Sequence, residues 1–303
     1  MDKETVIVTH SGSFHTDDVF AVATIKLFLG DVPCRIVRTR DMEIIKKGDF
    51  VVDVGNVYDS EKNCFDHHQQ EGGAGARDNG IPYSSFGLVW KKFGEKLCES
   101  KEVANIIEKR LVYPIDASDN GVETYIKSSE ELTPYTVHNI IGIFYPTQKE
   151  EEKGQNFDTA FTEALEIAQK ILSREIQLAR DKKDGEVFVE KAYDEAEDKR
   201  IIVIDGRYPW ETVLSHYPEP LYVVSPDSQG DNFWKVKAVR EDPEASFKNR
   251  KDLPKSWAGK RNEELAKVTG VSDATFCHNK CFIAVAGSKE GALNLAKLAI
   301  NSK

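Results

Sequence analysis

The sequence has no apolar run that approaches the roughly 20 residues of a membrane-spanning helix. Its opening residues, MDKETVIVTH, lead almost directly into an apolar stretch and show neither a basic region with a long apolar core nor an Arg-rich leader. No internal repeat is present, and the only biased tract is the short acidic run of residues 150–152. We therefore expect a protein of the cytoplasm, the nucleus or both, without a membrane partner.

Cysteine is scarce, and its five residues are odd in number and dispersed. This pattern argues against a disulfide framework. Cys277 and Cys281 enclose His278, which is half of a zinc-site pattern, but no second Cys/His pair lies nearby in the sequence. Ordinary buried thiols are therefore the expectation for these two cysteines.

Basic side chains are in the minority, with 41 Lys and Arg against 51 Asp and Glu and a net charge of −10. A passive nucleic-acid coat is usually basic, so this balance argues against nucleic-acid binding as the only function. The net charge does not exclude a nuclease, because bound divalent cations and a local basic patch can bind the phosphates of the substrate.

The order of apolar segments predicts an α/β fold. Strand-like segments cover residues 4–10, 33–40, 49–56 and 63–69, with a helical pattern over 17–30, and such alternation indicates a parallel sheet with helices on its faces. Apolar residues then follow a helical spacing from Phe157 to Ala179, and strands dominate from Arg200 onward. We expect an N-terminal parallel-sheet domain with the connecting helix over residues 1–182, and a smaller C-terminal α+β domain over residues 183–303.

Polar side chains gather where the first strands end. Four of the seven histidines fall into two short polar clusters. One cluster consists of His10, His15, Asp17 and Asp18, and the other of Asp66, His67 and His68. Three polar residues in a row after a buried strand are costly unless a metal or a phosphate holds them. Because ligands gather at the carboxyl ends of parallel strands, we expect His10, Asp53 and Asp66 to converge.

Carboxylates and imidazoles in this arrangement favour Mn²⁺ or Mg²⁺ over thiolate-bound zinc. One aspartate can bridge two ions about 3.5–4 Å apart, and such a pair activates water and stabilises a leaving oxygen. The candidate ligands are His10, His15, Asp17, Asp53, His67 and either Asp116 or Asp119. Taken alone, Asp53 is typical of a turn, and Asp17 or Asp18 of a helix cap. Their joint placement favours a metal site.

Residues 246–262, SFKNRKDLPKSWAGKRN, form the one basic patch that contains aromatic side chains. Six Lys and Arg residues outweigh Asp252, and Trp257 offers a face for base stacking. Such a patch suits a single-stranded nucleic-acid backbone. The alternative is a solvated loop with Trp257 packed inward.

The motifs resemble, in order, those of the melanocyte-proliferating-gene exonuclease (Myg) family, a branch of the DHH phosphoesterase superfamily. The segments that carry the resemblance are THSGSFHTDDVFA, VVDVGNVYD, CFDHHQ, YSSFGLVW, IDASDNG, SFKNRKDLPKSWAGKRNEEL and KEGAL. They extend from about Val8 to Leu295, which is nearly the whole chain. The resemblance implies a DHH-type catalytic domain followed by a substrate-binding domain.

The resemblance also implies roles for individual residues. His10, His15 and Asp17 match the first motif, Asp53 the bridging ligand, His67 a further ligand, and Asp116 or Asp119 the fourth motif. His68 is similar to the histidine that faces the substrate phosphate, and Asp66 would orient its neighbours. His278 and Gly287 stand near the family's glycine-rich substrate motif, in which this chain has a single glycine, and Arg250 and Arg261 of the basic patch would complete substrate binding.

We therefore expect a metal-dependent phosphodiesterase with two ions, Mn²⁺ or alternatively Mg²⁺. By resemblance it is a 3′–5′ exonuclease acting on RNA or on single-stranded nucleic acid more broadly. Two alternatives stay open. One is a hydrolase of short oligonucleotides or another small phosphorylated ligand, and the other is a non-catalytic relic that binds a partner. The sequence does not determine the oligomeric state.

Overall fold

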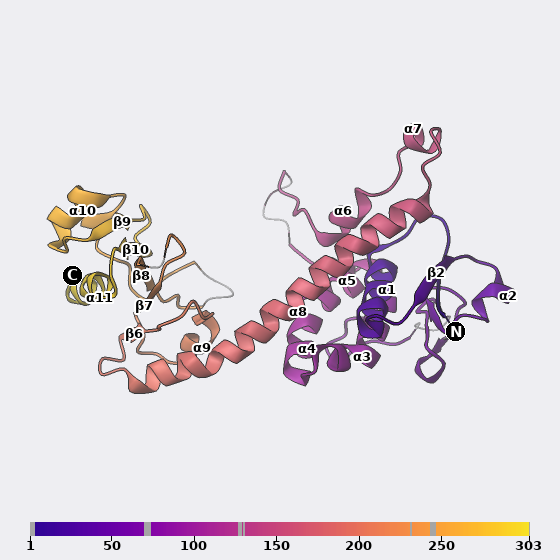
Figure 1. Ribbon diagram of the computed structural model, residues 1–303, viewed down its shortest axis with the longest axis horizontal. Helices are drawn as coiled ribbons and strands as arrows, with labels where there is room; N and C mark the ends of the chain where they lie inside the picture. The colour runs from indigo at the N-terminus through magenta and orange to yellow at the C-terminus, as the bar shows by residue number, and fades with distance from the viewer. Residues whose placement is uncertain are drawn as a thin grey trace. The chain divides into compact units, whose positions relative to one another are not determined.

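The computed structural model describes residues 4–69, 74–126, 129, 131–230, 232–242 and 247–302. The chain divides into two compact units, Met1–Arg180 (unit 1) and Asp181–Lys303 (unit 2). Helix α8 (Phe157–Glu195) begins in unit 1 and ends in unit 2 (Figure 1). In the described part of the chain, no helix is both long and apolar enough to cross a membrane.

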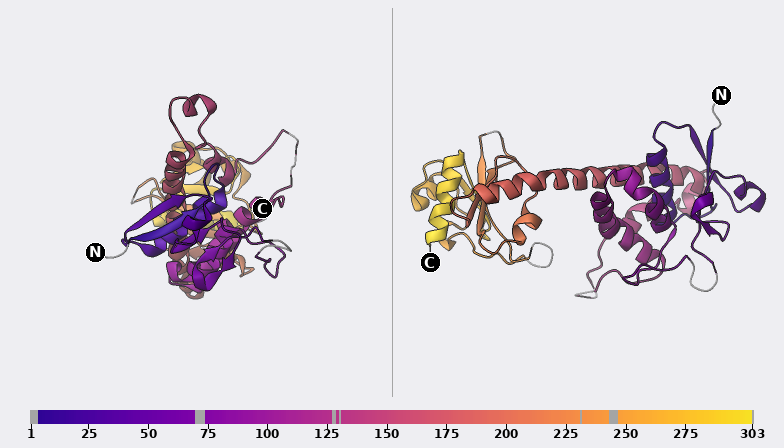
Figure 2. Two further views of the ribbon diagram at one scale, coloured as in Figure 1. Left: turned by 90° about the vertical axis from the view of Figure 1, so that its right-hand side faces the viewer. Right: turned by 90° about the horizontal axis from the view of Figure 1, so that it is seen from below.

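Unit 1 is built on a five-stranded sheet with the strand order β2-β1-β3-β5-β4, whose strands are seen side by side in Figure 2 (left). Its strands are β1 (Thr5–Thr9), β2 (Cys34–Arg38), β3 (Phe50–Val52), β4 (Tyr58–Asp59) and β5 (Cys64–Phe65). All neighbours pair in parallel except β4, which is antiparallel to β5. The predicted parallel sheet is confirmed, and the two-residue strand β4 is an addition to it.

Helix α1 (Thr16–Leu29) is the central helix of unit 1. Every residue from Thr16 to Ile25 is buried, which is typical of a helix enclosed on several sides. It packs against α3 (Ser85–Cys98) and joins the core that contains Ile7 and Val52 of the sheet. Gly30 ends the helix at a φ of 58°, a left-handed conformation that glycine adopts without steric cost. The helix predicted over residues 17–30 is confirmed.

A continuous helical segment follows α3 and carries two predicted site residues. It comprises α4 (Lys101–Ile107), a π-helical turn (Glu108–Val112) and α5 (Tyr113–Asp119). Pro114 lacks an N–H and its ring clashes with the carbonyl of the fourth residue before it, and the wider π turn directly before α5 accommodates this ring. The segment places Asp116 and Asp119 on the last turn.

The rest of unit 1 consists of short helices and the first half of α8. The short elements are α2 (Met42–Ile45), a 3₁₀ turn (Ser60–Lys62), α6 (Val137–Gly142) and α7 (Gln148–Glu151). Phe161, Leu165 and Leu172 of α8 are buried in the unit 1 core, so the helical spacing predicted from Phe157 is confirmed. The segment 146–156, expected as a loop, contains the single turn α7.

Unit 2 has a second five-stranded sheet, with the order β6-β7-β8-β10-β9. Its strands are β6 (Ile201–Val203), β7 (Tyr222–Pro226), β8 (Trp234–Ala238), β9 (Ala274–Cys277) and β10 (Ile283–Ala286). Only β6 and β7 are parallel; the other pairs are antiparallel. Helix α11 (Lys289–Asn301), yellow in Figure 2 (right), covers one face. The end of α8 and α9 (Glu211–Ser215) pack on the other face over β6 and β7.

The α+β character of the C-terminal part is confirmed, but three of its elements were not predicted. They are α9, α10 (Asn262–Thr269) and β9. Helix α10 is only eight residues long and buries Leu265 and Thr269, so its sequence carries too few apolar residues for a helical period. Trp257, in a 3₁₀ turn (Lys255–Trp257), is 4% exposed and packs in the core with Leu253 and Leu265. The interpretation of Trp257 as a stacking face is therefore wrong, and the inward-packed alternative is right.

Candidate metal centre

Three strands of the unit 1 sheet end beside one another, and each is followed by a polar side chain. His10 follows β1, Asp53 follows β3, and Asp66 follows β5. Because β1 pairs with β3 and β3 with β5 in parallel register, these ends lie at the same edge of the sheet. The exposed fractions are 2%, 4% and 2%. The structure thus brings together three buried polar side chains that are up to 56 positions apart in the sequence.

The start of α1 contributes two fully buried aspartates to this edge, Asp17 and Asp18. The backbone N–H of His15 donates to Oδ1 of Asp18 at 2.9 Å, and Oδ2 of Asp18 lies 3.1 Å from Nε2 of His10. Asp17 instead accepts from the backbone N–H of Ser85 at 3.2 Å and faces the cluster. The N-cap of α1 is His15, and Asp18, the third residue of the helix, completes a capping box by accepting from the His15 backbone.

Asp53 lies between two imidazoles. Its Oδ2 is 3.3 Å from Nε2 of His10, and its Oδ1 is 3.4 Å from Nε2 of His67. The hydroxyl of Ser85 also donates to Oδ1, at 2.8 Å. The backbone of Asp53 has a φ of 55°, a conformation that is uncommon outside glycine and that clusters at functional sites. Each carboxylate oxygen therefore faces a different histidine.

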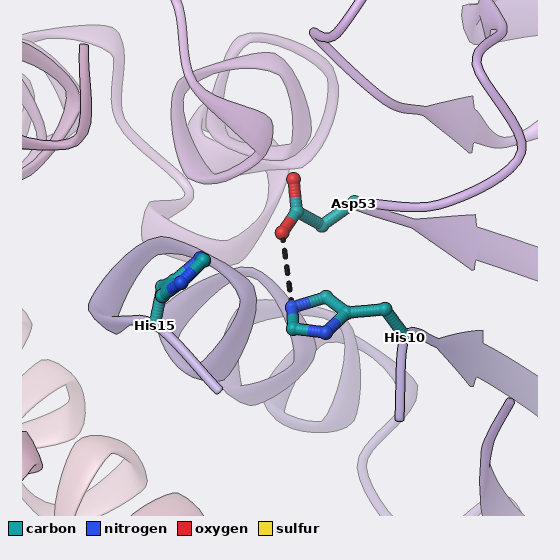
Figure 3. A group of neighbouring side chains, drawn as sticks. All are labelled: His10, His15 and Asp53. Carbon is teal, nitrogen blue, oxygen red and sulfur yellow. Dashed lines mark ion pairs between the residues drawn. The ribbon is translucent and has the colours of Figure 1, made fainter. Parts of the chain in front are cut away.

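Among the residues that the structure describes, three overlapping groups of side chains could hold a metal ion, and within each group the ligand atoms lie within 4.8 Å of one another. The groups are His10, His15 and Asp53; Asp53, His67 and His68; and His15, Asp17 and Asp119. Figure 3 shows the first group, with the Asp53 carboxylate directed at the His10 ring and His15 across from both. Because Asp53 and His15 each belong to two groups, the three form one continuous cluster.

The two aspartates at the end of α5 have different partners. Oδ2 of Asp119 lies 3.2 Å from Nε2 of His67, inside the cluster. Asp116 is fully buried, with Oδ2 2.8 Å from Nη2 of Arg77 and Oδ1 accepting from the hydroxyl of Ser84 at 2.6 Å. The structure therefore places Asp119 among the potential ligands and Asp116 in a neighbouring ion pair outside the three groups.

Asp66 orients His68. Its Oδ1 lies 2.8 Å from Nδ1 of His68 and accepts from the backbone N–H of the same residue at 3.1 Å. Its Oδ2 accepts from the backbone N–H of Asn56 at 2.6 Å. The His68 side chain is 58% exposed, against 9% for His67. His68 is therefore held at the rim of the cluster, while His67 lies inside it.

The crowding of carboxylates shifts the pKa values of these groups. Burial opposes the charge of His10, but pairing with Asp18 and Asp53 outweighs it and raises the pKa of His10 to about 10. Burial likewise opposes the charge of His67, and pairing with Asp119 and Asp53 raises its pKa to about 10. Burial together with the charge of Asp53 holds the pKa of Asp17 well above its usual range. In this structure positive imidazoles and protons thus balance the buried negative charge.

The cluster can hold metal ions. Oδ1 of Asp17 is buried without a hydrogen-bond partner among the described residues, and such an oxygen is costly unless a ligand pairs with it. A divalent cation at this place would supply that partner and replace the protons that now balance the carboxylates. The donors are carboxylate oxygens and imidazole nitrogens with no thiolate among them, a set that fits a hard or borderline ion.

Two residues that the sequence analysis missed lie beside the cluster. Arg40 follows β2, and with His10, Asp53 and His68 it lines a pocket of about 540 Å³. Its Nη2 lies 3.3 Å from Nδ1 of His10. The strand-end argument that located His10 applies equally to Arg40, so the signal was present.

The second missed residue is His138 in α6. Its Nε2 is buried without a hydrogen-bond partner among the described residues. Burial lowers the pKa of His138, and the nearby charges of Asp119 and His15 act on it in opposite directions. No motif surrounds His138 in the sequence, because a helix that is distant in the chain brings it to the cluster.

The four substrate residues predicted in unit 2 have diverse environments. The ring of His278 lies 4.5 Å from that of Phe282, and the guanidinium of Arg261 lies 4.9 Å from the centre of the Phe276 ring. Gly287 directly follows β10, and a Cβ there would lie 3.6 Å from Asp273, so this position does not require glycine.

Arg250 has a different set of partners. Its Nη1 donates to the carbonyl oxygens of Tyr217 at 2.6 Å and Pro220 at 3.1 Å, and its Nη2 donates to that of Ser215 at 3.2 Å. The guanidinium therefore braces the segment after α9. The sequence analysis treated Arg250 as an open cation of the basic patch because side-chain direction in a loop cannot be read from composition.

Comparison with known proteins identifies the family. The profile MYG1_exonuc, described as Uncharacterised protein family (UPF0160), matches residues 6–300. The chain belongs to this family, and the resemblance inferred from the motifs is confirmed.

Curated relatives match over nearly the whole chain. A MYG1 protein of Dictyostelium discoideum is 30% identical over 99% of this chain and 97% of its own length. A MYG1 protein of Saccharomyces cerevisiae is 30% identical over 97% and 95%, and the MYG1 exonuclease of Homo sapiens is 28% identical over 96% and 84%. A solved structure, described as the DHH domain of a member of a family of ribosomal proteins, covers 99% of this chain and 87% of its own at 13% identity and a TM-score of 0.29.

Proposed function

We propose that this protein is a metal-dependent phosphodiesterase that removes nucleotides from the 3′ end of RNA or of single-stranded nucleic acid. The single observation that carries the proposal is the position of Asp53, whose two oxygens face His10 and His67 at 3.3 and 3.4 Å. This is the arrangement expected of a carboxylate that bridges two cations. Curated relatives named as exonucleases support the reaction class.

The proposed ligands are His10, His15, Asp17, Asp53, His67 and Asp119, and the proposed ions are two Mn²⁺ or two Mg²⁺. When bound, such ions supply the Lewis acidity that activates water and polarises a phosphoryl oxygen. Asp53 belongs to two of the three ligand groups, so it would fix their spacing. We propose Asp119 rather than Asp116 as a metal ligand, because Oδ2 of Asp116 is already paired with Nη2 of Arg77 at 2.8 Å.

Two cationic side chains at the pocket are proposed to face the scissile phosphate. Asp66 raises the pKa of His68 above its usual range through their hydrogen bond, which favours an imidazolium at the rim. Arg40 offers a guanidinium, a group that binds phosphate oxygens in a bidentate manner. Together they would stabilise the negative charge that develops as the phosphodiester bond breaks.

A nuclease assay with end-labelled single-stranded RNA and Mn²⁺ tests the proposal. We expect a ladder that shortens from the 3′ end with the wild type and no products with Asp53→Asn or His67→Ala. Asp31→Asn serves as the matched control, because it removes an exposed carboxylate in the turn after α1, and it should leave the ladder unchanged. Equal activity of Asp53→Asn and the wild type would contradict the site, and an inactive wild type would contradict the reaction.

The pocket itself favours a second candidate, the hydrolysis of short oligonucleotides or another small phosphorylated compound. Its volume of about 540 Å³ lies within the range of small-molecule sites. The two candidates differ in their dependence on chain length. Turnover that falls as the RNA is lengthened beyond a few nucleotides would support the small substrate, and turnover that holds or rises would support the polymer.

A further inference from the structure

A short loop joins two of the proposed metal ligands. His10 follows β1 and His15 precedes α1, and the residues between them, 11–14, form the segment that we call the ligand loop. At Gly12 the loop has a φ of 90°, a left-handed conformation that favours glycine. The loop has no regular secondary structure, so its shape, and with it the placement of the two histidines, depends on contacts with other segments.

Arg38, the last residue of β2, contacts the middle of the ligand loop. Its Nη2 donates to the carbonyl oxygen of Gly12 at 2.6 Å. Its Nη1 lies 2.7 Å from Oδ1 of Asp158, which belongs to the first turn of α8. One guanidinium therefore joins the ligand loop to a helix that is distant from it in the sequence.

Aromatic rings surround the same guanidinium and the end of the ligand loop. The guanidinium carbon of Arg38 lies 4.7 Å from the centre of the Phe161 ring and 5.7 Å from that of Phe14. Phe14 is fully buried, and three rings lie edge-on to its own at centroid distances of 4.8–6.4 Å. They belong to Tyr145, Phe157 and Phe161. The Tyr145 hydroxyl also donates to the carbonyl oxygen of Phe14. The loop is thus held both at its middle and at its end.

As an ion pair, Arg38 and Asp158 contribute little to stability. The Arg38 side chain is 4% exposed, while that of Asp158 is 68% exposed. The Nε of Arg38 is buried and has no hydrogen-bond partner among the described residues. Burial of a cation costs free energy that a largely hydrated carboxylate does not fully offset, and an unbranched apolar side chain could pack on the same rings. The contact that requires an arginine here is the hydrogen bond to the ligand loop.

We propose that Arg38 is a positioning residue for the candidate metal centre: it fixes the ligand loop, and through it His10 and His15, against the first turn of α8. These two histidines belong with Asp53 to one group of potential ligands (Figure 3). The inference rests on the proposed function, because it concerns the affinity for the metal ions that this function requires.

The role of Arg38 should be specific to one of the two ions. Both ligand groups that contain His15 depend on the ligand loop, whereas the group of Asp53, His67 and His68 has no member on it or at its ends. Loss of Arg38 should therefore weaken the ion beside His15 and spare the ion beside His67. A general loss of stability would not distinguish between them.

The test is the Mn²⁺ content of the full chain after dialysis at the concentration that just saturates the wild type. The wild type should hold two ions. Arg38→Met should hold one, because the loss of an outer contact that orients ligands weakens metal binding about 10–100-fold. Arg38→Lys keeps the charge without the forked geometry and should recover part of the binding. Asp158→Ala changes an exposed side chain and should give a smaller loss.

Each type of substitution has a matched control. Arg180 is another arginine that braces backbone carbonyls, with Nε 3.3 Å from the oxygen of Cys98 and Nη2 3.0 Å from that of Leu97. Arg180→Met should hold two ions whatever its effect on thermal unfolding. Glu163→Ala removes another exposed carboxylate of α8 and should also hold two ions.

Amide hydrogen exchange tests the connection to α8 independently of activity. Because coupling between two sites is reciprocal, Mn²⁺ should slow the exchange of residues 158–162 more than that of residues 170–176, which lie later in the same helix. In Arg38→Met this difference between the two segments should disappear.

The inference is wrong if Arg38→Met holds two ions with the affinity of the wild type, or if Arg180→Met loses as much Mn²⁺ as Arg38→Met does. If Arg38→Met does not fold, wild-type Mn²⁺ affinity in both Arg38→Lys and Asp158→Ala refutes it. These outcomes leave the proposed function intact, because the wild type still binds its ions. A wild type that binds no Mn²⁺ instead refutes the proposed metal centre, and the role of Arg38 with it.

Discussion

Ser85 donates a hydrogen bond of 2.8 Å from its hydroxyl to Oδ1 of Asp53, and both side chains are buried. The backbone N–H of Ser85 also donates to Asp17, so the start of α3 holds two potential ligands. We expect Ser85→Ala to weaken Mn²⁺ binding about tenfold, because the carboxylate loses the contact that orients it. Isothermal titration with Mn²⁺ measures this.

The neighbouring residue supplies the matched control. Ser84 donates to Asp116 instead, outside the three ligand groups. Ser84→Ala should lower the free energy of unfolding by about 1–3 kcal/mol and leave Mn²⁺ affinity close to that of the wild type. An equal loss of affinity in both variants would mean that Ser85 has no specific role at the cluster.

Asp116 and Asp119 should behave differently when each is changed to Asn. Asp116→Asn removes the carboxylate charge that pairs with buried Arg77, and it should lower the free energy of unfolding by about 3 kcal/mol. Asp119→Asn removes one of the carboxylates that face His67, and it should abolish tight Mn²⁺ binding. Urea unfolding and Mn²⁺ titration of both variants show which aspartate is the ligand. Loss of tight Mn²⁺ binding in Asp116→Asn but not in Asp119→Asn would make Asp116 the ligand.

Arg40→Ala should lower kcat/KM on single-stranded RNA by about 10²–10³-fold, the range measured when one donor to transition-state charge is removed. Mn²⁺ affinity should change little, because Arg40 offers no ligand atom. Arg40→Lys should recover only part of the activity, since a lysine cannot form the bidentate contact. Full activity of Arg40→Ala with normal metal binding would show that Arg40 does not stabilise the transition state.

Without metal, the protein should become less stable as the pH rises from 6 to 8.5. The folded pKa values of His10 and His67 are about 10, against an ordinary value of 6.5. Their contribution to stability is therefore complete below pH 6.5 and is lost progressively towards pH 10. The raised pKa of Asp17 acts in the same direction, because the folded state resists its ionisation.

Urea unfolding in EDTA at the two pH values measures this dependence. In saturating Mg²⁺ the decline should shrink or reverse, because a cation replaces the protons and its ligands bind better when deprotonated. Equal or greater stability of the EDTA-treated protein at the higher pH would contradict the picture of a cluster whose charge is balanced by protons.

The sequence alone was sufficient to predict the sheet edge that carries the cluster. The apolar runs before His10, Asp53 and Asp66 identify the strands, and the parallel arrangement brings their ends together. The end of β2 lies at the same edge of the sheet, but the polar side chain that follows it, Arg40, was not predicted as a site residue. The choice between Asp116 and Asp119 could not be made, because residues three apart on a helix lie near the same face and their partners are distant in the chain.

The C-terminal unit was harder to predict. A run of basic residues does not show which of them are exposed, and the structure directs Arg250 to backbone carbonyls and Trp257 into the core. Strand β9 was not predicted at all, so the register between β8, β10 and β9 could not be predicted either.

The proposed bridging of two divalent ions by Asp53, at the strand ends of unit 1, predicts a definite Mn²⁺ stoichiometry of the full chain. Mass spectrometry of the metal content after equilibrium dialysis measures it. We expect two Mn²⁺ per wild-type chain and at most one in Asp53→Asn, with both proteins folded by circular dichroism. A wild type that binds no Mn²⁺, or an Asp53→Asn variant that binds as many ions as the wild type, would contradict the account.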